Sequence, residues 1–207
     1  MTAAQNRALD GLLPRYGAPE GVLDLRQLFG REARRTLEIG FGDGETLMEL
    51  AHLHPGEDYL GIEVHRPGVG RLLMALESEG LENVRVLNAD AVQVLETRLP
   101  DGSLDALLTY FPDPWPKKRH HKRRLVQPEF TALAARKLKP GGRWHLATDW
   151  EDYALHMLTV LSAAPGFTNL SPTGDWVPRP PERPATKFER RGLKLGHRVR
   201  DLLFMRQ

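Results

Sequence analysis

The chain has 207 residues, of which 41% are hydrophobic, enough to bury the core of one domain. It contains no cysteine, which excludes disulfide bonds and thiolate metal sites, and it has neither an apolar run of membrane-spanning length nor a secretory pattern at its start. The cytosol is therefore the expected location. Residues 1–112 carry 10 Lys and Arg against 18 Asp and Glu, whereas residues 113–207 carry 19 against 9. This sorting favours a polyanionic partner, unless folding mixes the two halves.

Short apolar runs alternate with stretches of helical periodicity along most of the chain. The predicted strands are 35–40, 58–64, 84–90, 104–111 and 143–149, with two closing strands at 166–171 and 199–206. The predicted helices are 44–54, 68–80, 91–99, 128–142 and 150–163. Such alternation predicts right-handed crossovers, and hence an α/β fold with a doubly wound, mostly parallel seven-stranded sheet of Rossmann-like type.

One domain is expected to span residues 1–207, with two appendages. The first is a short N-terminal segment over 1–34. The second is a basic loop over about 175–198, in which Gly192 and Gly196 argue against a continuous helix. We expect this loop to return over the ligand-binding edge of the sheet.

The first predicted strand ends in a glycine-rich turn, EIGFGDGET, with glycines at 40, 42 and 44. Glycines let the backbone turn tightly and approach a ligand closely. The dinucleotide fingerprint is G-x-G-x-x-G, but here Glu45 occupies the last position. With Glu38 before it, the turn is more typical of S-adenosylmethionine binding. A plain strand-to-helix turn is the alternative.

Acids also follow the next two strands. Glu63 could accept hydrogen bonds from both ribose hydroxyls, and Asp90 could accept one from the exocyclic amine of adenine. The simpler alternatives are a solvated acid at 63 and a helix cap at 90. Because open α/β sheets bind ligands at the carboxyl ends of their strands, Glu38, Glu63 and Asp90 together predict a cofactor that contains a nucleoside.

The fourth strand leads into YFPDPWPKKRHHKRRL. Pro112 and Pro114 restrict the backbone around Asp113, so that this carboxylate is held in a fixed orientation. Trp115 offers a flat face on which a base can stack. Residues 117–124 contain six permanent cations and two histidines, which predicts a track for a phosphate backbone. A merely solvated loop is the alternative.

The fifth strand ends in TDWED, where Asp149 could face the same edge or cap the next helix. Near the C-terminus, ATKFERRGLKLGHRVRDLLF interleaves basic residues with Thr186, Phe188 and Glu189. Together with the segments LEIGFGDG, GIEVHRPGVG, FPDPWPKKRHHKRRL and TDWEDYA, this stretch resembles the bacterial tRNA (guanine-N7)-methyltransferase family. The resemblance runs from about residue 35 to the C-terminus. The glycine turn is shared by many methyltransferases, whereas the FPDPW and TKFE segments are specific to the family.

The resemblance implies a class I methyltransferase fold. It also implies transfer of a methyl group from S-adenosylmethionine to N7 of a guanine in tRNA (position 46, in the variable loop), leaving S-adenosylhomocysteine. TAAQNRALDGLLPRYG at the start also resembles the family's N-terminal segment. Relatives carry a basic extension upstream of this segment, and we expect no counterpart of its RNA contacts within residues 1–207. No metal is expected, and the assembly is expected to be a monomer or a homodimer.

The resemblance also implies roles for individual residues. The implied contacts with S-adenosylmethionine are Glu38, Gly40, Gly42, Gly44, Glu63, Asp90 and Asp113, and Asp113 is in addition the catalytic acid of the active site. The implied contacts with the substrate are Lys117, Asp149, Thr186, Lys187, Phe188 and Glu189. The residues implied to lie against RNA are Arg119, His120, His121, Lys122, Arg123 and Arg124.

Guanine N7 carries a lone pair and no proton, so its methylation needs no base. We therefore expect Asp113 to orient the guanine by accepting from its N1–H and N2–H groups, with Asp149 and Glu189 as candidates for the same edge. Two alternatives stand beside this interpretation. An adenine-N6 methyltransferase would use a D/N-P-P-Y/F turn, to which PDPW is similar. A non-catalytic RNA-binding subunit would not need Glu63, Asp90 and Asp113.

Overall fold

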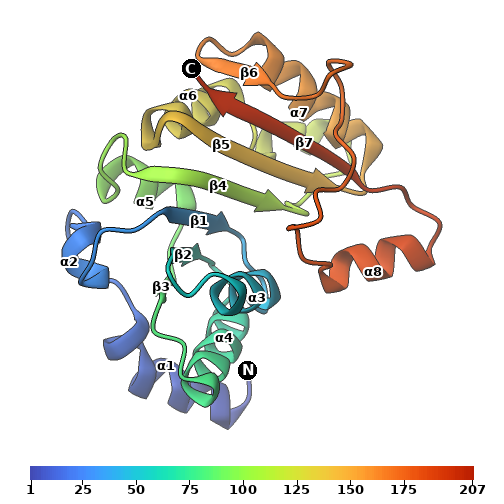
Figure 1. Cartoon of the computed structure of the whole chain (residues 1–207). Helices are drawn as coiled ribbons and strands as arrows, with labels where there is room; N and C mark the ends of the chain where they lie inside the picture. The colour runs from blue at the N-terminus through green and yellow to red at the C-terminus, as the bar shows by residue number, and fades with distance from the viewer.

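The structure is a computed structural model that describes residues 1–207, apart from the side chain of Phe188. Seven strands form one sheet in the order β3-β2-β1-β4-β5-β7-β6 (Figure 1). The strands are β1 (Arg35–Ile39), β2 (Asp58–Ile62), β3 (Val84–Leu87), β4 (Leu104–Tyr110), β5 (Leu138–Thr148), β6 (Phe167–Asn169) and β7 (Arg200–Arg206). The first five pair in parallel, and β7 runs antiparallel to β5 and β6. The predicted fold class is confirmed.

The helices connect these strands and cover both faces of the sheet. They are α1 (Ala3–Tyr16), α2 (Leu25–Phe29), α3 (Glu45–Leu53), α4 (Arg66–Glu79), α5 (Ala91–Thr97), the 3₁₀-helix η1 (Lys118–Arg123), α6 (Pro128–Lys137), α7 (Glu151–Ala163) and α8 (Lys187–Lys194). No described helix combines the length and apolar character needed to cross a membrane.

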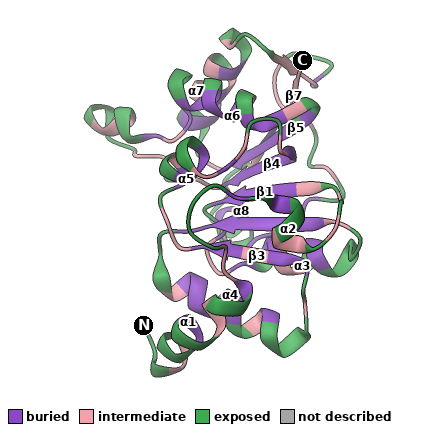
Figure 2. Ribbon diagram, turned by 90° about the vertical axis from the view of Figure 1, so that its left-hand side faces the viewer, coloured by how far each residue is buried: buried purple, intermediate pink, exposed green. Residues whose placement is uncertain are grey.

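Two hydrophobic cores result, one on each face, because successive side chains of a strand point to opposite faces. On one face α5, α6 and α7 pack on residues such as Leu37 and Trp144. On the other face α1, α3 and α4 pack on residues such as Tyr59 and Leu108. Figure 2 shows the buried strands running through the middle of the molecule between these helical layers. The carboxyl ends of the parallel strands therefore meet at one edge, which can hold a ligand.

The N-terminal segment over 1–34 contains the helices α1 and α2. Thr2 and Gln5 form a capping box that begins α1, and α1 packs against α4. Gly70 of α4 allows this contact, because a Cβ there would come within 2.9 Å of the Gln5 carbonyl oxygen. Tyr16 ends the helix and donates from its hydroxyl to Glu77 Oε2 at 2.9 Å.

Several predicted elements differ from the structure in their bounds, and two of them differ most. The helix predicted to reach residue 142 ends at Lys137, whose buried ammonium donates to the Leu99 carbonyl at 2.8 Å, and Leu138 already pairs with Leu104 in the sheet. The loop predicted over about 175–198 contains helix α8, which runs through Gly192. Glycine usually disfavours a helix because its backbone is more flexible than that of other residues. At position 192, however, a larger residue would clash, because a Cβ would lie 2.7 Å from Asp149 Oδ2.

Candidate active site

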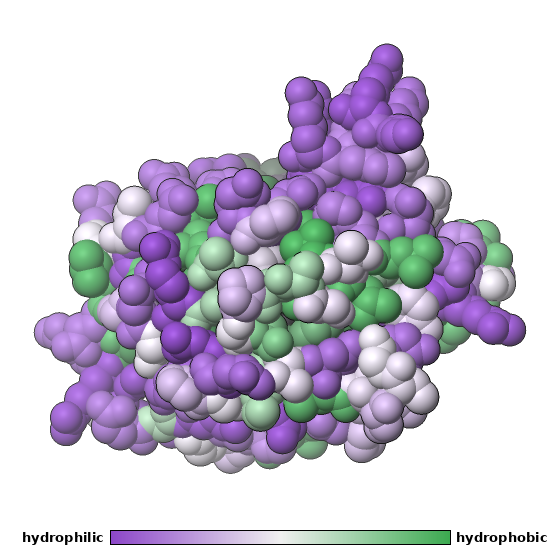
Figure 3. All heavy atoms as spheres, turned by 90° about the horizontal axis from the view of Figure 1, so that it is seen from above, coloured by the Kyte–Doolittle hydropathy of each residue, from purple (hydrophilic) through white to green (hydrophobic). Residues whose placement is uncertain are grey.

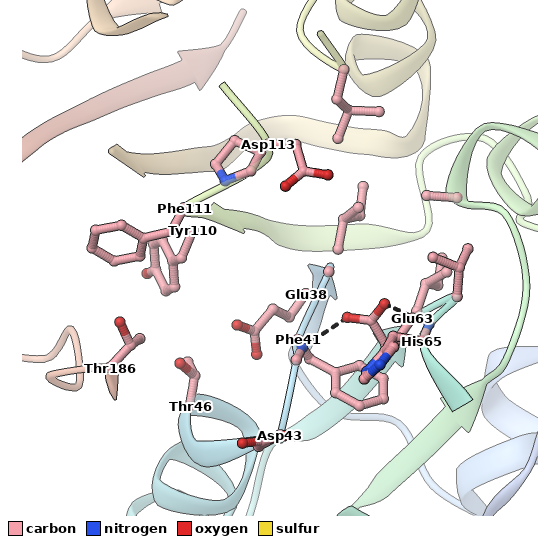
Figure 4. A pocket seen from close by; sticks show the side chains of 18 of the residues that line it. Glu38, Phe41, Asp43, Thr46, Glu63, His65, Tyr110, Phe111, Asp113 and Thr186 are labelled. Carbon is pink, nitrogen blue, oxygen red and sulfur yellow. Dashed lines mark hydrogen bonds between the residues drawn. The ribbon is translucent and has the colours of Figure 1, made fainter. Parts of the chain in front are cut away.

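A cavity of about 500 Å³ lies at the carboxyl ends of β1 to β4. This volume is in the usual range for small-molecule sites. It brings together residues that the sequence analysis selected on four different strand ends and on the segment before the last strand (Figure 4). Those residues are Glu38, Gly40, Gly42, Glu63, Asp90, Asp113, Thr186 and Lys187. Among the described residues, no group of His, Cys, Asp and Glu is arranged to hold a metal ion.

The glycine turn after β1 forms one wall of the cavity. Gly40 and Gly42 have φ values of 74° and 59°, a left-handed conformation that other residues adopt at a cost. The Gly42 amide donates to Glu63 Oε2 at 2.9 Å, which joins this turn to the end of β2. Gly44 has a different role. It is the N-cap of α3, and a Cβ there would lie 2.6 Å from the Leu72 side chain, so the structure does not bring Gly44 to the cavity.

Glu38 has a buried carboxyl group at the back of the cavity, with only 3% of its surface exposed. Burial raises its pKa to about 8, opposed by a hydrogen bond with Thr46 and reinforced by the nearby charge of Glu63. Its Oε2 atom has no hydrogen-bond partner among the described residues. Because an unpaired buried acceptor is costly, this oxygen suits a ligand that carries a hydrogen-bond donor or a positive charge.

Glu63 and Asp90 line the cavity while serving the local backbone. The Glu63 carboxylate accepts from the amides of Gly42 and His65, at 2.9 and 2.8 Å, and each of its oxygens keeps a second lone pair for a ligand. Asp90 is the N-cap of α5, where its Oδ1 accepts from the Gln93 amide at 3.0 Å. Its side chain is exposed, so the capping alternative and a ligand contact are compatible.

The loop after β4 is held in an uncommon backbone conformation. Phe111 and Trp115 have φ values of 51° and 46°, which are unusual for residues other than glycine. They flank Pro112, Asp113 and Pro114, where two further φ angles are fixed by the proline rings. Asp113 is exposed at the cavity beside Phe111 and Tyr110, as Figure 4 shows. Its carboxylate is thus presented on a restricted loop, as the sequence predicts.

The basic run continues as the 3₁₀-helix η1. Lys117, Arg119 and Lys122 are exposed, whereas His120 and His121 are half-buried. The guanidinium of Arg123 lies 5.0 Å from the centre of the Trp115 ring, and both side chains line the cavity. The exposed cations therefore form a positively charged rim next to Trp115.

The expectation that Arg124 lies against RNA is corrected. This residue is only 3% exposed. Its Nε donates to the Pro114 carbonyl at 2.9 Å, its Nη2 pairs with Asp152, and its guanidinium lies 4.8 Å from the Tyr153 ring centre. Arg124 therefore fastens the Asp113 loop to α7 and is not part of the exposed rim.

Helix α8 lies at the opposite side of the cavity mouth. Thr186 caps it by accepting from the Glu189 amide at 3.2 Å. Lys187 pairs through its ammonium with Asp43, and its amide donates to Glu45 Oε2 at 3.0 Å. Arg190 also pairs with Glu45, at 3.0 Å. The start of α8 is thus tied to the glycine turn and to α3, which explains why Thr186 and Lys187 reach the cavity.

Of the residues implied to meet the substrate, two lie away from the cavity and the side chain of a third is not described. Glu189 is only 3% exposed, and both its carboxylate oxygens accept from Arg183, which corrects its expected place at a guanine edge. Asp149 neither caps α7 nor lines the cavity. It accepts from His197 Nδ1 at 3.0 Å and lines a separate hollow with Trp150. The side chain of Phe188 lies outside the described residues.

The cavity wall also contains residues that the sequence motifs did not indicate. Thr46 bonds to Glu38, and Tyr110 and Phe41 line the cavity beside it. A polar residue in the first turn of α3 and an aromatic residue at the last position of β4 were the available signals. Neither residue type points to a ligand by itself, because both are common in ordinary cores.

Comparison with known proteins identifies the family. A family model described as a methyltransferase matches residues 32–202. A tRNA (guanine-N(7)-)-methyltransferase of Pseudomonas putida (strain W619) is 58% identical over 206 residues, covering 99% of this chain and 86% of the relative. A protein of the same name from Halorhodospira halophila is 56% identical, covering 99% of this chain and 90% of the relative. The chain belongs to the tRNA (guanine-N(7)-)-methyltransferase family. The resemblance seen in its motifs is confirmed.

Solved structures show the same fold at low sequence identity. The 16S rRNA methyltransferase KamB superposes with a TM-score of 0.66 at 17% identity, over 91% of this chain and 95% of that one. A SAM-dependent methyltransferase from Aquifex aeolicus gives a TM-score of 0.59 at 16% identity, over the full length of both chains. The family's methyl donor is S-adenosylmethionine. The residues present fit it, since Glu38 offers an unpaired buried acceptor and Glu63 and Asp90 offer further oxygens along the same cavity.

Proposed function

We propose that this protein transfers the methyl group of S-adenosylmethionine to N7 of a guanine in tRNA, at position 46 of the variable loop. One observation carries the proposal: a single cavity joins the acids of three strand ends to Asp113, on a restricted loop that continues into an exposed basic rim. The relatives' name supports guanine N7 over the adenine-N6 alternative and over a non-catalytic subunit. The proposal includes a cytoplasmic location and action as a monomer or a homodimer.

The cofactor would be held by groups that match its parts. Glu38 would pair with the ammonium group of the methionine moiety, because this removes the cost of its buried, unpaired oxygen. Glu63 would accept from the ribose hydroxyls with the lone pairs that its backbone contacts leave open. Asp90 would accept from the adenine amine. When bound, the cofactor supplies a methyl group attached to a positively charged sulfur. The N7 lone pair can attack this methyl carbon directly, and the sulfur leaves as S-adenosylhomocysteine.

Asp113 would orient the guanine. Its carboxylate can accept from both N1–H and N2–H, which are on the guanine edge away from N7, so pairing there turns N7 toward the methyl group. No proton leaves N7, so Asp113 need not act as a base. The product ring carries a positive charge, which the same carboxylate would stabilise.

The tRNA backbone would lie across the exposed basic rim. Lys117, Arg119 and Lys122 would neutralise phosphates there, with Lys187 on the other side of the mouth. Phosphate contacts fix register and carry little base selectivity, so selection of the guanine would depend on Asp113 and its neighbours.

The decisive experiment is methylation of unmodified tRNA with labelled S-adenosylmethionine, followed by mass spectrometry of the nucleosides, which identifies the modified base, and of ribonuclease fragments, which locate it. N7-methylguanosine at position 46 is the expected product, and methylation only of adenine, or none, would overturn the proposal. Asp113→Asn should then lower the single-turnover rate roughly a hundredfold or more, since preorganised polar groups of this kind contribute about 2.7–4 kcal/mol to transition states. The control is Glu96→Gln, which changes an exposed acid in α5 and should leave the rate unchanged.

A further inference from the structure

A chain of buried polar side chains joins α8 to the wall of the cofactor cavity. Its five members come from five parts of the chain, and each is at most 9% exposed. They are Glu189 in α8, Arg183 before α8, Asp201 in β7, His145 in β5 and Tyr110 at the end of β4. Figure 1 shows α8 to the side of the sheet, joined by a loop at each end. Side-chain contacts connect it to the rest of the molecule, among them those of Glu189 with Arg183.

Arg183 is the centre of this chain of contacts. Its side chain is fully buried, and its two terminal nitrogens donate to the two oxygens of Glu189 at 2.8 and 2.9 Å. On its other side, Nε lies 2.6 Å from Asp201 Oδ1, and Nη2 donates to Asp201 Oδ2 at 3.2 Å. A planar guanidinium that bridges two carboxylates fixes their relative geometry. Because desolvation offsets most of the attraction in a buried ion pair, such a group contributes more to orientation than to stability.

The contacts continue from Asp201 to the cavity. Asp201 Oδ1 lies 2.8 Å from His145 Nε2, and His145 Nδ1 lies 2.9 Å from the Tyr110 hydroxyl. Tyr110 is the last residue of β4, lines the cavity and directly precedes the loop that bears Asp113. The same network therefore reaches both the segment at the cavity mouth and the strand end behind Asp113.

The first turn of α8 shows that this arrangement replaces only the glutamate half of a capping box. Thr186 and Glu189 have the T-x-x-E spacing of a capping box, in which the glutamate reaches back to the backbone of the capping residue. Here the Thr186 half of the cap forms, but the Glu189 carboxylate turns inward to Arg183. The glutamate thus ties the helix to the sheet instead of capping it.

We propose that Arg183 is a positioning residue for methyl transfer, which acts through Glu189 and Asp201. It fixes Thr186 and Lys187 at the mouth of the cavity relative to the strand end that carries Asp113. This inference rests on the proposed function. It also assigns Glu189 an indirect role, since its carboxylate holds α8 in place and does not face the cavity.

The test separates positioning from stability. Arg183→Met alone would leave two buried carboxylates without their cation, so it is combined with Glu189→Gln, which removes one of those charges. A second variant, Arg183→Lys, keeps the charge but loses the planar bridge. The matched control is Arg136→Met, because Arg136 is an exposed arginine of α6 that lies outside this network. Each protein is assayed for thermal unfolding, S-adenosylmethionine affinity by calorimetry, and kcat and KM for tRNA.

The double variant and Arg183→Lys should each lose about tenfold to a hundredfold in kcat at saturating tRNA, while folding at the assay temperature and cofactor affinity are retained. The control should stay within about twofold of wild type. If the double variant is unfolded, Arg183→Lys decides alone. A folded variant with wild-type kcat would overturn the inference. A wild-type protein that methylates no guanine N7 in tRNA would overturn the proposed function and this inference with it.

Discussion

The buried carboxyl of Glu38 should make cofactor binding depend on pH, because burial raises its pKa to about 8. With a pKa of about 8, this group is about nine-tenths protonated at pH 7 in the ligand-free protein. Pairing with the cofactor's ammonium would hold it in the charged form, so binding at pH 7 should release about 0.9 proton from Glu38. Between pH 6 and pH 7, affinity for S-adenosylmethionine should rise roughly tenfold, since one proton must leave for each cofactor bound.

The same group should also affect the stability of the ligand-free protein, but in the opposite direction: the free energy of unfolding should fall as pH rises. The folded-state pKa of Glu38 lies above the ordinary glutamate value of 4.5, so the folded protein keeps a proton that the unfolded chain releases. Its contribution to stability is present below about pH 4.5 and is lost as pH rises toward 8, by up to roughly 5 kcal/mol. Glu38→Gln cannot titrate and should abolish this decline.

Isothermal titration calorimetry in two buffers of different ionisation enthalpy measures the proton release directly, and denaturant unfolding from pH 5 to pH 8 measures the stability. Asp90→Asn is the matched control, because Asp90 is an exposed acid of the same cavity and its loss should leave the proton release unchanged. Binding with no proton release in the wild-type protein, or with the same release in Glu38→Gln, would refute the reasoning.

Three further predictions concern the rest of the site. Glu63→Ala should weaken S-adenosylmethionine binding about tenfold or more by calorimetry, because it removes hydrogen bonds of about 0.5–1.5 kcal/mol each; unchanged affinity would remove Glu63 from the cofactor site. Replacing Arg119 and Lys122 with glutamine should make the plot of log tRNA affinity against log salt concentration less steep, by about one unit of slope per lost phosphate contact. Cofactor binding should not change. An unchanged slope would show that the rim is a solvated surface that does not contact phosphates. Gly192→Ala should displace the Asp149 carboxylate, because a Cβ at 192 would approach Asp149 Oδ2 to 2.7 Å. If Asp149 takes part in methylation, this variant should have a lower kcat, while its free energy of unfolding changes by less than about 1 kcal/mol. A wild-type kcat would argue against any role of Asp149 in methylation.

The surface on the side of the molecule where β6 and α7 lie is mixed in character. Figure 3, a view from above, shows hydrophilic residues over much of this face with apolar patches between them. Trp150 and Leu155 are examples of exposed apolar side chains, and both line the hollow next to Asp149. Gly192→Ala therefore also tests whether this second hollow takes part in the reaction.

The sequence by itself determined the sheet and the ligand-binding edge. Strand and helix alternation is a local pattern, and each buried strand produces its own apolar run, so five parallel strands and the positions just after them could be read directly. Glu38, Glu63 and Asp113 were selected because parallel strands must place their carboxyl ends at one edge, whatever the details of packing. The family motifs added the chemistry of the cofactor and the acceptor.

Only the tertiary structure decided what each charged side chain near that edge contacts. Arg124 and Arg119 belong to the same basic run, yet one is buried against α7 and the other is exposed. Helix α8 has a glycine at position 192, where Asp149, far away in sequence, occupies the space that a side chain would need. Arg183 finds its carboxylate partners on α8 and β7. Local periodicity carries no information on such pairings, because burial of a charge depends on which distant segments supply its counter-charge.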